Sequence, residues 1–175
     1  MNGEILPLVR GGDLESSLAG DDKLELKVWL RLLTCSAMIE REVRTRLRAQ
    51  FDITLPRFDL LAQLDRAPEG LTMGELSSRL MVSNGNVTGL AERLAQEGLI
   101  SREAPANDRR TQLVKLTPAG KRAFDAMTPQ HETWIDALFA GLTRDAMATL
   151  LALLGRLKAS LKQHQDDGNA HASAD

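Results

Sequence analysis

A short polar run near the middle of the chain carries side chains that can recognise nucleic-acid bases. Its members are two asparagines, two hydroxyl residues and two glycines: Ser83, Asn84, Gly85, Asn86, Thr88 and Gly89. Asparagine can read adenine through paired hydrogen bonds, hydroxyl groups can hold a phosphate or a base edge, and glycine lets the backbone come close. Each glycine costs a helix about 1 kcal/mol relative to alanine, so a helix with both is expected to gain from close approach. The alternative is a capped but weakly formed helix start.

Basic residues follow this polar run. Residues 71–123 carry eight basic and five acidic residues, although the formal net charge of the whole chain is −2. Arg109 and Arg110 lie in a polar loop between two candidate strands, and Arg102 and Lys115 lie on those strands. Arginine suits the narrow, electronegative minor groove of DNA. Ordinary surface charge would explain each of these residues alone, but explains them less well together with the preceding helices.

Helix and strand signals in the sequence predict the elements that carry both groups of residues. Thr72 and Glu75 form a capping box, which predicts a short helix to about Leu80, and Ser83 caps a second helix that ends near Gly98. An alternating pattern then predicts strands at residues 99–102 and 112–116. In this order, the first helix can cross a DNA backbone, the second can enter the major groove and the hairpin can reach a flanking minor groove.

Long helices flank these elements. Residues 24–50 lack Gly and Pro and predict one helix about 40 Å long. Pro56 and Pro118 mark further helix starts, and Pro129 is expected to kink or interrupt the helix after Pro118. The last helix, residues 144–163, carries an apolar stripe of Met147, Leu150, Leu151, Leu154 and Leu157. A domain this small cannot cover both terminal helices, so a second copy of the chain is expected to do so.

Composition excludes several classes of protein. The single Cys cannot close an intrachain disulfide, and the N-terminus lacks the basic start and apolar stretch of a signal peptide. Residues 146–154, the densest apolar stretch, have about half the length of a membrane-spanning helix, so a cytoplasmic protein without membrane contact is expected. The chain has no Gly-rich phosphate loop, and its histidines lack metal-ligand spacing. An enzyme, a metal site and a cofactor are therefore not expected.

Five segments together carry a resemblance to a known family. They are Ile53-Thr54-Leu55-Pro56-Arg57-Phe58, Leu76-Ser77-Ser78-Arg79-Leu80, Val87-Thr88-Gly89-Leu90-Ala91-Glu92-Arg93-Leu94, Asn107-Asp108-Arg109-Arg110 and Leu116-Thr117-Pro118-Ala119-Gly120. Over residues 24–163 the chain resembles the MarR (multiple antibiotic resistance regulator) family. Each segment alone is common, but their occurrence in this order is highly specific.

The resemblance implies a mainly α fold with a small β-hairpin wing. This is a winged helix–turn–helix whose N- and C-terminal helices form a dimerisation domain. The expected domains are a flexible N-terminal arm (1–23), a helical dimerisation region (24–52 and 118–163), a winged DNA-binding domain (53–117) and a disordered tail (164–175).

The resemblance also implies function and site residues. Such a homodimer is usually a repressor of transcription that binds double-stranded DNA. The recurrent wing pair falls on Asp108 and Arg110, and Arg93 is expected to brace Asp108 rather than read a base. Gly89 departs from the family, where a basic or polar side chain is frequent, so the base read there is open. The expected DNA-binding residues are Ser83, Asn84, Asn86, Thr88, Arg102, Arg109 and Arg110.

Members of the family also respond to small ligands, often anionic and aromatic, that bind between the dimer helices and the winged module. Apolar walls with one or two cations suit an aromatic carboxylate, or its coenzyme A thioester if the pocket is open. The candidate residues are Arg31, Cys35, Met38, Ile39, Leu55, Phe58, His131 and Trp134. The alternative is that the aromatic residues among them belong to the core or to an interface.

Two other interpretations remain open. Cys35 can act as an oxidant sensor, but this chain has no Tyr to supply the hydrogen bonds that support the sensor thiol in such relatives. A dimeric helical adaptor could also keep the winged fold without binding DNA. Steep loss of DNA affinity with rising salt distinguishes a DNA-binding protein from the adaptor.

Overall fold

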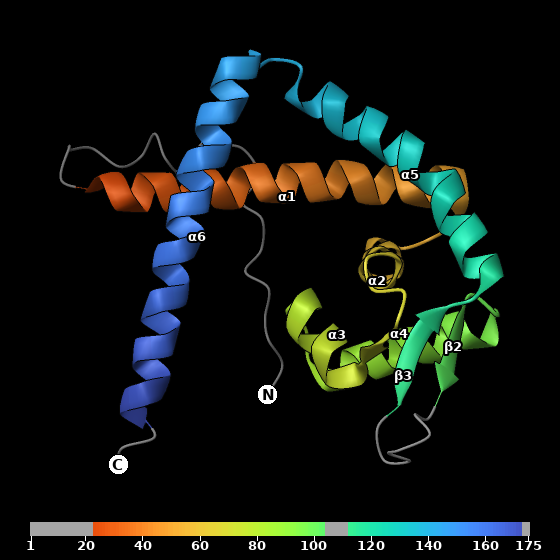
Figure 1. Ribbon diagram of the computed structural model, residues 1–175. Coiled ribbons are helices and arrows are strands. Elements are labelled where there is room, and N and C mark those ends of the chain that lie inside the picture. Colours follow the sequence, from red (N-terminus) through yellow and green to blue (C-terminus); the bar gives the residue numbers. More distant parts are fainter. Residues whose placement is uncertain (1–22, 104–111, 173–175) are drawn as a thin grey trace. The chain divides into compact units, whose positions relative to one another are not determined.

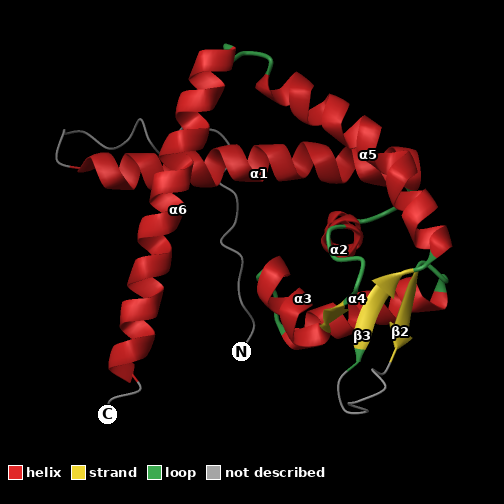
Figure 2. Ribbon diagram, viewed as in Figure 1, coloured by secondary structure: helices red, strands yellow, loops and turns green. Residues whose placement is uncertain are grey.

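The computed structural model describes residues 23–103 and 112–172, with side chains up to residue 166 (Figure 1). The described part is mostly helical and contains one small antiparallel sheet (Figure 2). The helices are α1 (Leu24–Phe51), α2 (Leu55–Asp65), α3 (Met73–Leu80), α4 (Asn84–Gln96), α5 (Pro118–Phe139) and α6 (Arg144–Ala172). The strands are β1 (Leu71–Thr72), β2 (Ile100–Glu103) and β3 (Leu113–Leu116). The mainly α fold class with a β-hairpin is therefore confirmed.

The sheet has the strand order β1-β3-β2. β2 and β3 form the expected hairpin, in which Ile100 faces Leu116 and Glu103 faces Leu113. β1 was not expected from the sequence. It pairs with the other edge of β3, so that Leu71 lies opposite Val114. This short strand ties the start of α3 to the wing.

Local capping residues begin and end the helices largely where the sequence predicts. Thr72 and Glu75 form the capping box of α3, with Glu75 N donating to Thr72 Oγ1 at 3.2 Å and Thr72 N donating to Glu75 Oε2 at 2.7 Å. The backbone N–H and the hydroxyl group of Thr72 both donate to Glu75 Oε2, at 2.7 and 2.9 Å, and lower the pKa of this carboxyl because they favour its charged form. Ser83 caps α4, as its hydroxyl oxygen accepts a hydrogen bond from Asn86 N at 3.4 Å. α1 ends at Asp52, which adopts a left-handed conformation.

The core lies between α2, α3, α4, the end of α1 and the sheet. Its fully buried side chains are aliphatic and come from each of these elements: Leu47, Leu60, Leu61, Leu64, Leu76, Val87, Leu94 and Val114. Among the described residues, no polar or charged residue is buried in this core. Apolar burial therefore fixes how α3 and α4 are held against the sheet.

Helix α5 runs through Pro129 without interruption. The expected interruption is absent because Pro129 is exposed, where solvent can satisfy the carbonyl group that a proline leaves without an N–H donor. One residue earlier, Thr128 Oγ1 donates a hydrogen bond to Phe124 O at 3.0 Å.

Helix α6 extends to Ala172, beyond its predicted end at residue 163. The expectation of a disordered tail is therefore wrong for residues 164–172. The segment is polar but contains no proline and a single glycine, so nothing in it stops the helix. The predicted N-terminal arm, residues 1–22, lies outside the described residues.

Contacts divide the chain into two compact units, Met1–His131 and Glu132–Asp175. This boundary falls inside α5 and differs from the expected grouping of residues 24–52 with 118–163. No single helix in the described segments is both long and apolar enough to cross a membrane, although α5 and α6 taken together pass on length and composition.

Candidate nucleic-acid interface

The turn between α3 and α4 sets where the polar run begins. Met81 ends α3 in a left-handed conformation, with φ of 54° and a side chain that is 90% exposed. Ser77 Oγ donates a hydrogen bond to Val82 O at 2.6 Å, and Val82 N donates to Ser77 O at 3.2 Å. These bonds fix the tight turn that directs α4 away from α3.

The first turns of α4 present the predicted base-reading residues to solvent. Ser83, Asn84, Asn86 and Thr88 are all exposed, whereas Val87 on the opposite face is fully buried. The Ser83 and Thr88 hydroxyl groups are partly used inside the helix, since Thr88 Oγ1 donates to Asn84 O at 2.8 Å. Neither Asn84 nor Asn86 makes a side-chain hydrogen bond to another described residue. The two amides can therefore donate and accept hydrogen bonds toward an external molecule.

The glycines of α4 have no packing role within the described chain. A Cβ atom built on Gly85 or Gly89 would meet no other atom within 4 Å. The surface beside the asparagines is therefore open. This supports the interpretation that the glycines allow close approach of an external molecule.

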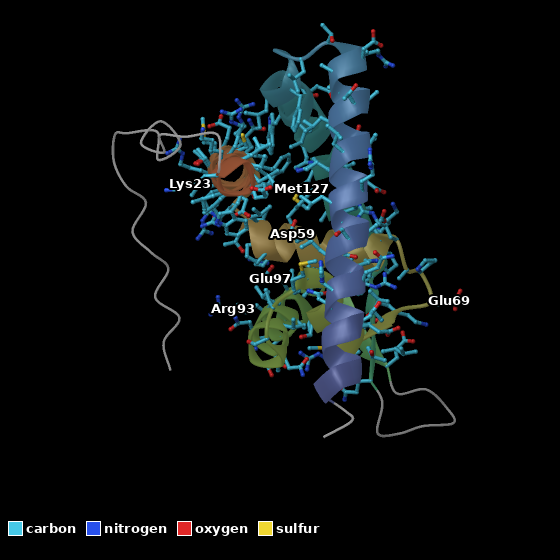
Figure 3. All side chains as sticks on the ribbon, turned by 90° about the vertical axis from the view of Figure 1, so that its left-hand side faces the viewer. Lys23, Asp59, Glu69, Arg93, Glu97 and Met127 are labelled. Atoms are coloured by element: carbon cyan, nitrogen blue, oxygen red, sulfur yellow. The ribbon has the colours of Figure 1, made fainter. Side chains whose placement is uncertain are left out.

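The wing adds exposed positive charge beyond α4. Arg102 is exposed on β2, and Lys115 on β3 forms an ion pair with Glu103 at 3.4 Å. The predicted tip residues Asp108, Arg109 and Arg110 lie outside the described residues. Arg93, predicted to brace Asp108, is exposed on α4 one turn before Glu97 (Figure 3). Its role toward the wing thus stays a prediction.

A tight junction holds the wing against α5. Thr117 Oγ1 donates to Gly98 O at 2.6 Å and accepts a hydrogen bond from Gly120 N at 3.0 Å. A Cβ atom on Gly120 would lie 1.8 Å from Leu99 O, so only glycine fits there. This contact fixes the start of β2, and hence the direction of the hairpin, relative to the first turn of α5.

The eight predicted effector residues differ in exposure. Arg31, Cys35 and Met38 are exposed on α1, while Ile39 and Leu55 are half-buried. Phe58 is buried, and its ring centroid lies 4.8 Å from that of His131 and 5.5 Å from that of Phe124. The structure thus brings Phe58 and His131 together, as the ligand interpretation requires, but their packing with Phe124 equally fits a core cluster. Trp134, in the second unit, is buried.

Sequence reasoning missed an acidic contact between α1 and α2. Burial of Asp59 on α2 (labelled in Figure 3), together with the charge of Glu40 on α1, raises the pKa of the Asp59 carboxyl to about 6. It also missed the ion pair of Arg57 with Glu97, whose partners are 40 residues apart. No local pattern marks either pair, because the partners lie on different helices.

Comparison with known proteins agrees with this geometry. The MarR family profile matches residues 51–111, which include α2, α3, α4 and the predicted wing tip. Over 161 residues, the chain is 27% identical to the transcriptional activatory protein BadR of Rhodopseudomonas palustris, covering 89% of this chain and 91% of BadR.

Solved structures give the same result. S. aureus MepR in complex with DNA has a TM-score of 0.66 and 25% identity, covering 74% of this chain and 94% of MepR. A MarR family transcriptional regulator from Silicibacter pomeroyi has a TM-score of 0.68 and 30% identity, covering 81% of this chain and 98% of that protein. The chain is therefore a member of the MarR family of winged helix–turn–helix, DNA-binding transcriptional regulators.

Proposed function

We propose that this regulator binds a pseudo-palindromic operator as a homodimer and leaves it when a small effector binds. The observation that carries the DNA-binding part is the exposed first half of α4. There, two asparagine amides lie beside two glycines with open space around them. With the N-terminal end of α4 in the major groove, Asn84 and Asn86 would read bases, and Ser83 and Thr88 would contact phosphates or base edges.

The wing supplies the second part of the proposed interface. Arg102 on β2 is exposed, and Arg109 and Arg110 follow in the sequence between β2 and β3. We assign these arginines to the phosphates and the minor groove beside the α4 site, with Arg93 and Asp108 bracing the loop. Backbone neutralisation by arginine makes affinity fall with salt, because counterions are released from DNA on binding.

Exposed apolar side chains support the homodimer. On the N-terminal half of α1 they are 43% to 61% exposed: Leu24, Leu26, Val28, Trp29, Leu33 and Met38. On α6 they are 36% to 74% exposed: Leu150, Leu151, Leu153, Leu154, Leu157 and Leu161. A two-fold partner would cover both surfaces. Two α4 helices would then meet successive major grooves about 34 Å apart.

The effector proposal rests on the residues around Phe58 and His131. We assign the cation of this site to Arg31 on α1, because an apolar wall with a positive charge suits an aromatic carboxylate or its coenzyme A thioester. Control through oxidation of Cys35 is the second candidate, favoured by the exposure of this thiol. Unchanged DNA affinity of Cys35→Ser relative to wild type after peroxide treatment would leave ligand control as the better account.

The direction of regulation depends on the operator as well as on the protein. We propose repression, in which the bound dimer blocks a promoter, although the relative BadR is named an activatory protein. A reporter fused to the operator distinguishes the two, because loss of this protein raises expression under repression and lowers it under activation.

Salt-dependent DNA binding tests the proposal. Wild-type protein should lose affinity steeply between 50 and 200 mM salt, and Arg110→Ala should reduce the slope of log affinity against log salt by about one unit. Asn86→Ala should weaken specific binding by about tenfold and leave the slope unchanged. Arg144→Ala, an exposed change at the start of α6, serves as the control. Salt-independent binding, or none, would favour a helical adaptor.

Among the described residues, no cluster of His, Cys, Asp and Glu could hold a metal ion. The relatives and structures to which the chain is similar are transcriptional regulators, not enzymes. We therefore propose no catalytic role.

A further inference from the structure

A cavity of about 410 Å³ lies within the first unit, and none of the predicted effector residues lines it. Segments from the end of α1, the start of α2, the end of α4 and the middle of α5 contribute to it. Its apolar wall includes Ile53, Leu99, Ala123, Ala126 and Met127. The two alanines leave space that larger side chains would fill. This volume and lining are typical of small-molecule sites.

Phe51 and three charged residues form the remaining part of the wall. Arg57 from α2 is ion-paired with Glu97 at the end of α4, and Asp52 is ion-paired with Arg48 at 3.4 Å. The charges at this end of the cavity are therefore balanced. A carboxylate entering the cavity would have to compete with Glu97 for Arg57 and would be repelled by both acidic side chains.

Arg57 has one group that the protein does not satisfy. Its Nε–H is covered from solvent and has no hydrogen-bond partner in the described part of the chain. A buried N–H without an acceptor is unfavourable, so the arginine gains free energy if it turns to meet an acceptor oxygen. Turning Nε toward the cavity requires a rotation of the Arg57 side chain, which loosens its ion pair with Glu97.

We propose that this cavity binds an uncharged, largely apolar small molecule that carries one carbonyl oxygen. The oxygen accepts a hydrogen bond from Arg57 Nε, and the apolar body packs against Ala123, Ala126 and Met127 on α5. The site is separate from the anionic effector site, since no residue of that predicted site lines this cavity.

The location of the cavity gives binding a consequence for DNA recognition. Glu97 is the C-cap of the helix that carries Asn84 and Asn86, and Leu99 precedes β2. A molecule bound between these residues and α5 changes how the end of α4 packs. This regulatory consequence rests on the proposed DNA-binding function, whereas the binding itself does not.

Three compounds of nearly equal shape test the ligand chemistry. Acetophenone has the carbonyl, α-methylstyrene replaces its oxygen with CH₂, and benzoate carries a negative charge. In NMR titrations of the labelled full-length protein, acetophenone should bind at least tenfold more tightly than either analogue. The shifted amides should centre on residues 51–53, 97–99 and 123–127. Equal affinities, tighter binding of benzoate, absence of saturable binding, or shifts centred elsewhere would overturn the proposal.

Two variants test the site itself. Ala126→Leu should abolish acetophenone binding by filling the cavity, whereas Ala137→Leu, on the same helix but outside the cavity wall, should leave it unchanged. Arg57→Lys retains the charge but lacks Nε, so it should remove the tenfold preference for acetophenone over α-methylstyrene. If Ala126→Leu does not fold, Arg57→Lys alone tests the site. A preference for acetophenone that persists in Arg57→Lys contradicts the proposal. DNA affinity measured without any compound tests the proposed function separately.

Discussion

The aliphatic side chains of α4 and those of α6 have opposite environments. On α4, Val87 and Leu94 are fully buried by neighbouring elements of their own chain. On α6, Leu150, Leu151 and Leu154 stay exposed, although the sequence shows a comparable helical stripe. Burial of one large aliphatic side chain is worth about 1.5–3 kcal/mol, so the two helices differ greatly in the stabilisation that they draw from a single chain.

This difference in burial implies different roles for the two helices. The buried face of α4 fixes the position of its polar face, so the reading surface can form in one chain. The α6 stripe gains stability only when another surface covers it, and in the proposed dimer that surface belongs to a second copy. Changes around α4 should therefore affect folding at any protein concentration, and changes on α6 should affect association.

The largest effect on the free energy of unfolding is expected from shortening a buried side chain of α4. Leu94→Ala should lower the free energy of unfolding by about 3 kcal/mol at all protein concentrations, because it leaves a cavity in the core. Leu151→Ala, at a position that is 74% exposed, is the matched control. Its effect in urea titrations should depend on protein concentration. A concentration-independent loss in both variants would contradict these different roles.

The second-largest effect on stability is expected at the junction that orients the wing. Gly120→Ala should cost about 2 kcal/mol, because its Cβ would collide with Leu99 O. Gly74→Ala is the control, since a Cβ atom there meets nothing within 4 Å, and it should change stability by less than about 1 kcal/mol. Thermal unfolding followed by circular dichroism checks both variants. Equal melting temperatures for the two would show that the junction is not rigid.

Replacing Asp59 should have a smaller effect on the free energy of unfolding, and this effect should depend on pH. The folded-state pKa of about 6 exceeds the ordinary value of 3.8, so the folded chain holds more protons than the unfolded chain between these values. The contribution of Asp59 to stability is therefore greatest below pH 3.8, falls as the pH rises to about 6, and is then level. Asp59→Asn should thus stabilise the protein by about 1 kcal/mol at pH 7.5, after allowance for solvent screening, and much less at pH 4.5.

Unfolding of wild-type and Asp59→Asn protein in urea at the two pH values measures this difference. The same gain at both values would exclude titration of Asp59 as its cause.

The smallest stability change is expected at the reading surface. Gly89→Ala should stabilise α4 by at most about 1 kcal/mol, because alanine is the better helix former and its Cβ has free space. If DNA approaches closely there, the same change should weaken operator binding by about tenfold. Fluorescence anisotropy on an operator fragment measures this. Unchanged affinity would place the DNA contact elsewhere on α4.

Local signals in the sequence predicted most helix starts. The capping box of Thr72 and Glu75, the Ser83 cap and the pair Thr117-Pro118 each act through residues close together in the chain, and each begins a helix as expected. Polar composition misled at the other end of the chain, and of the kink or interruption expected at Pro129 the interruption is absent. α5 tolerates Pro129 at an exposed position, and polar residues continue α6 to Ala172.

Features built from distant residues could not be predicted in this way. β1 is only two residues long and exists because β3 pairs with it. The raised pKa of Asp59 comes from burial and from the charge of Glu40 on another helix, and the cavity beside Arg57 needs four segments of the chain. Of the candidate DNA-binding residues, those at the start of α4 and Arg102 are exposed, as contact with DNA requires, while the DNA-binding role of all of them stays a prediction.

Hydroxyl-radical footprinting of the operator tests the central claim most directly. If a homodimer places its two α4 helices in successive major grooves, wild-type protein should protect two half-sites whose centres lie about 10 bp apart, on one face of the duplex. Leu151→Asp should lose both footprints together at protein concentrations where the wild type is dimeric. A single protected half-site for the wild type, or two footprints that survive in a monomeric Leu151→Asp protein, would contradict the account.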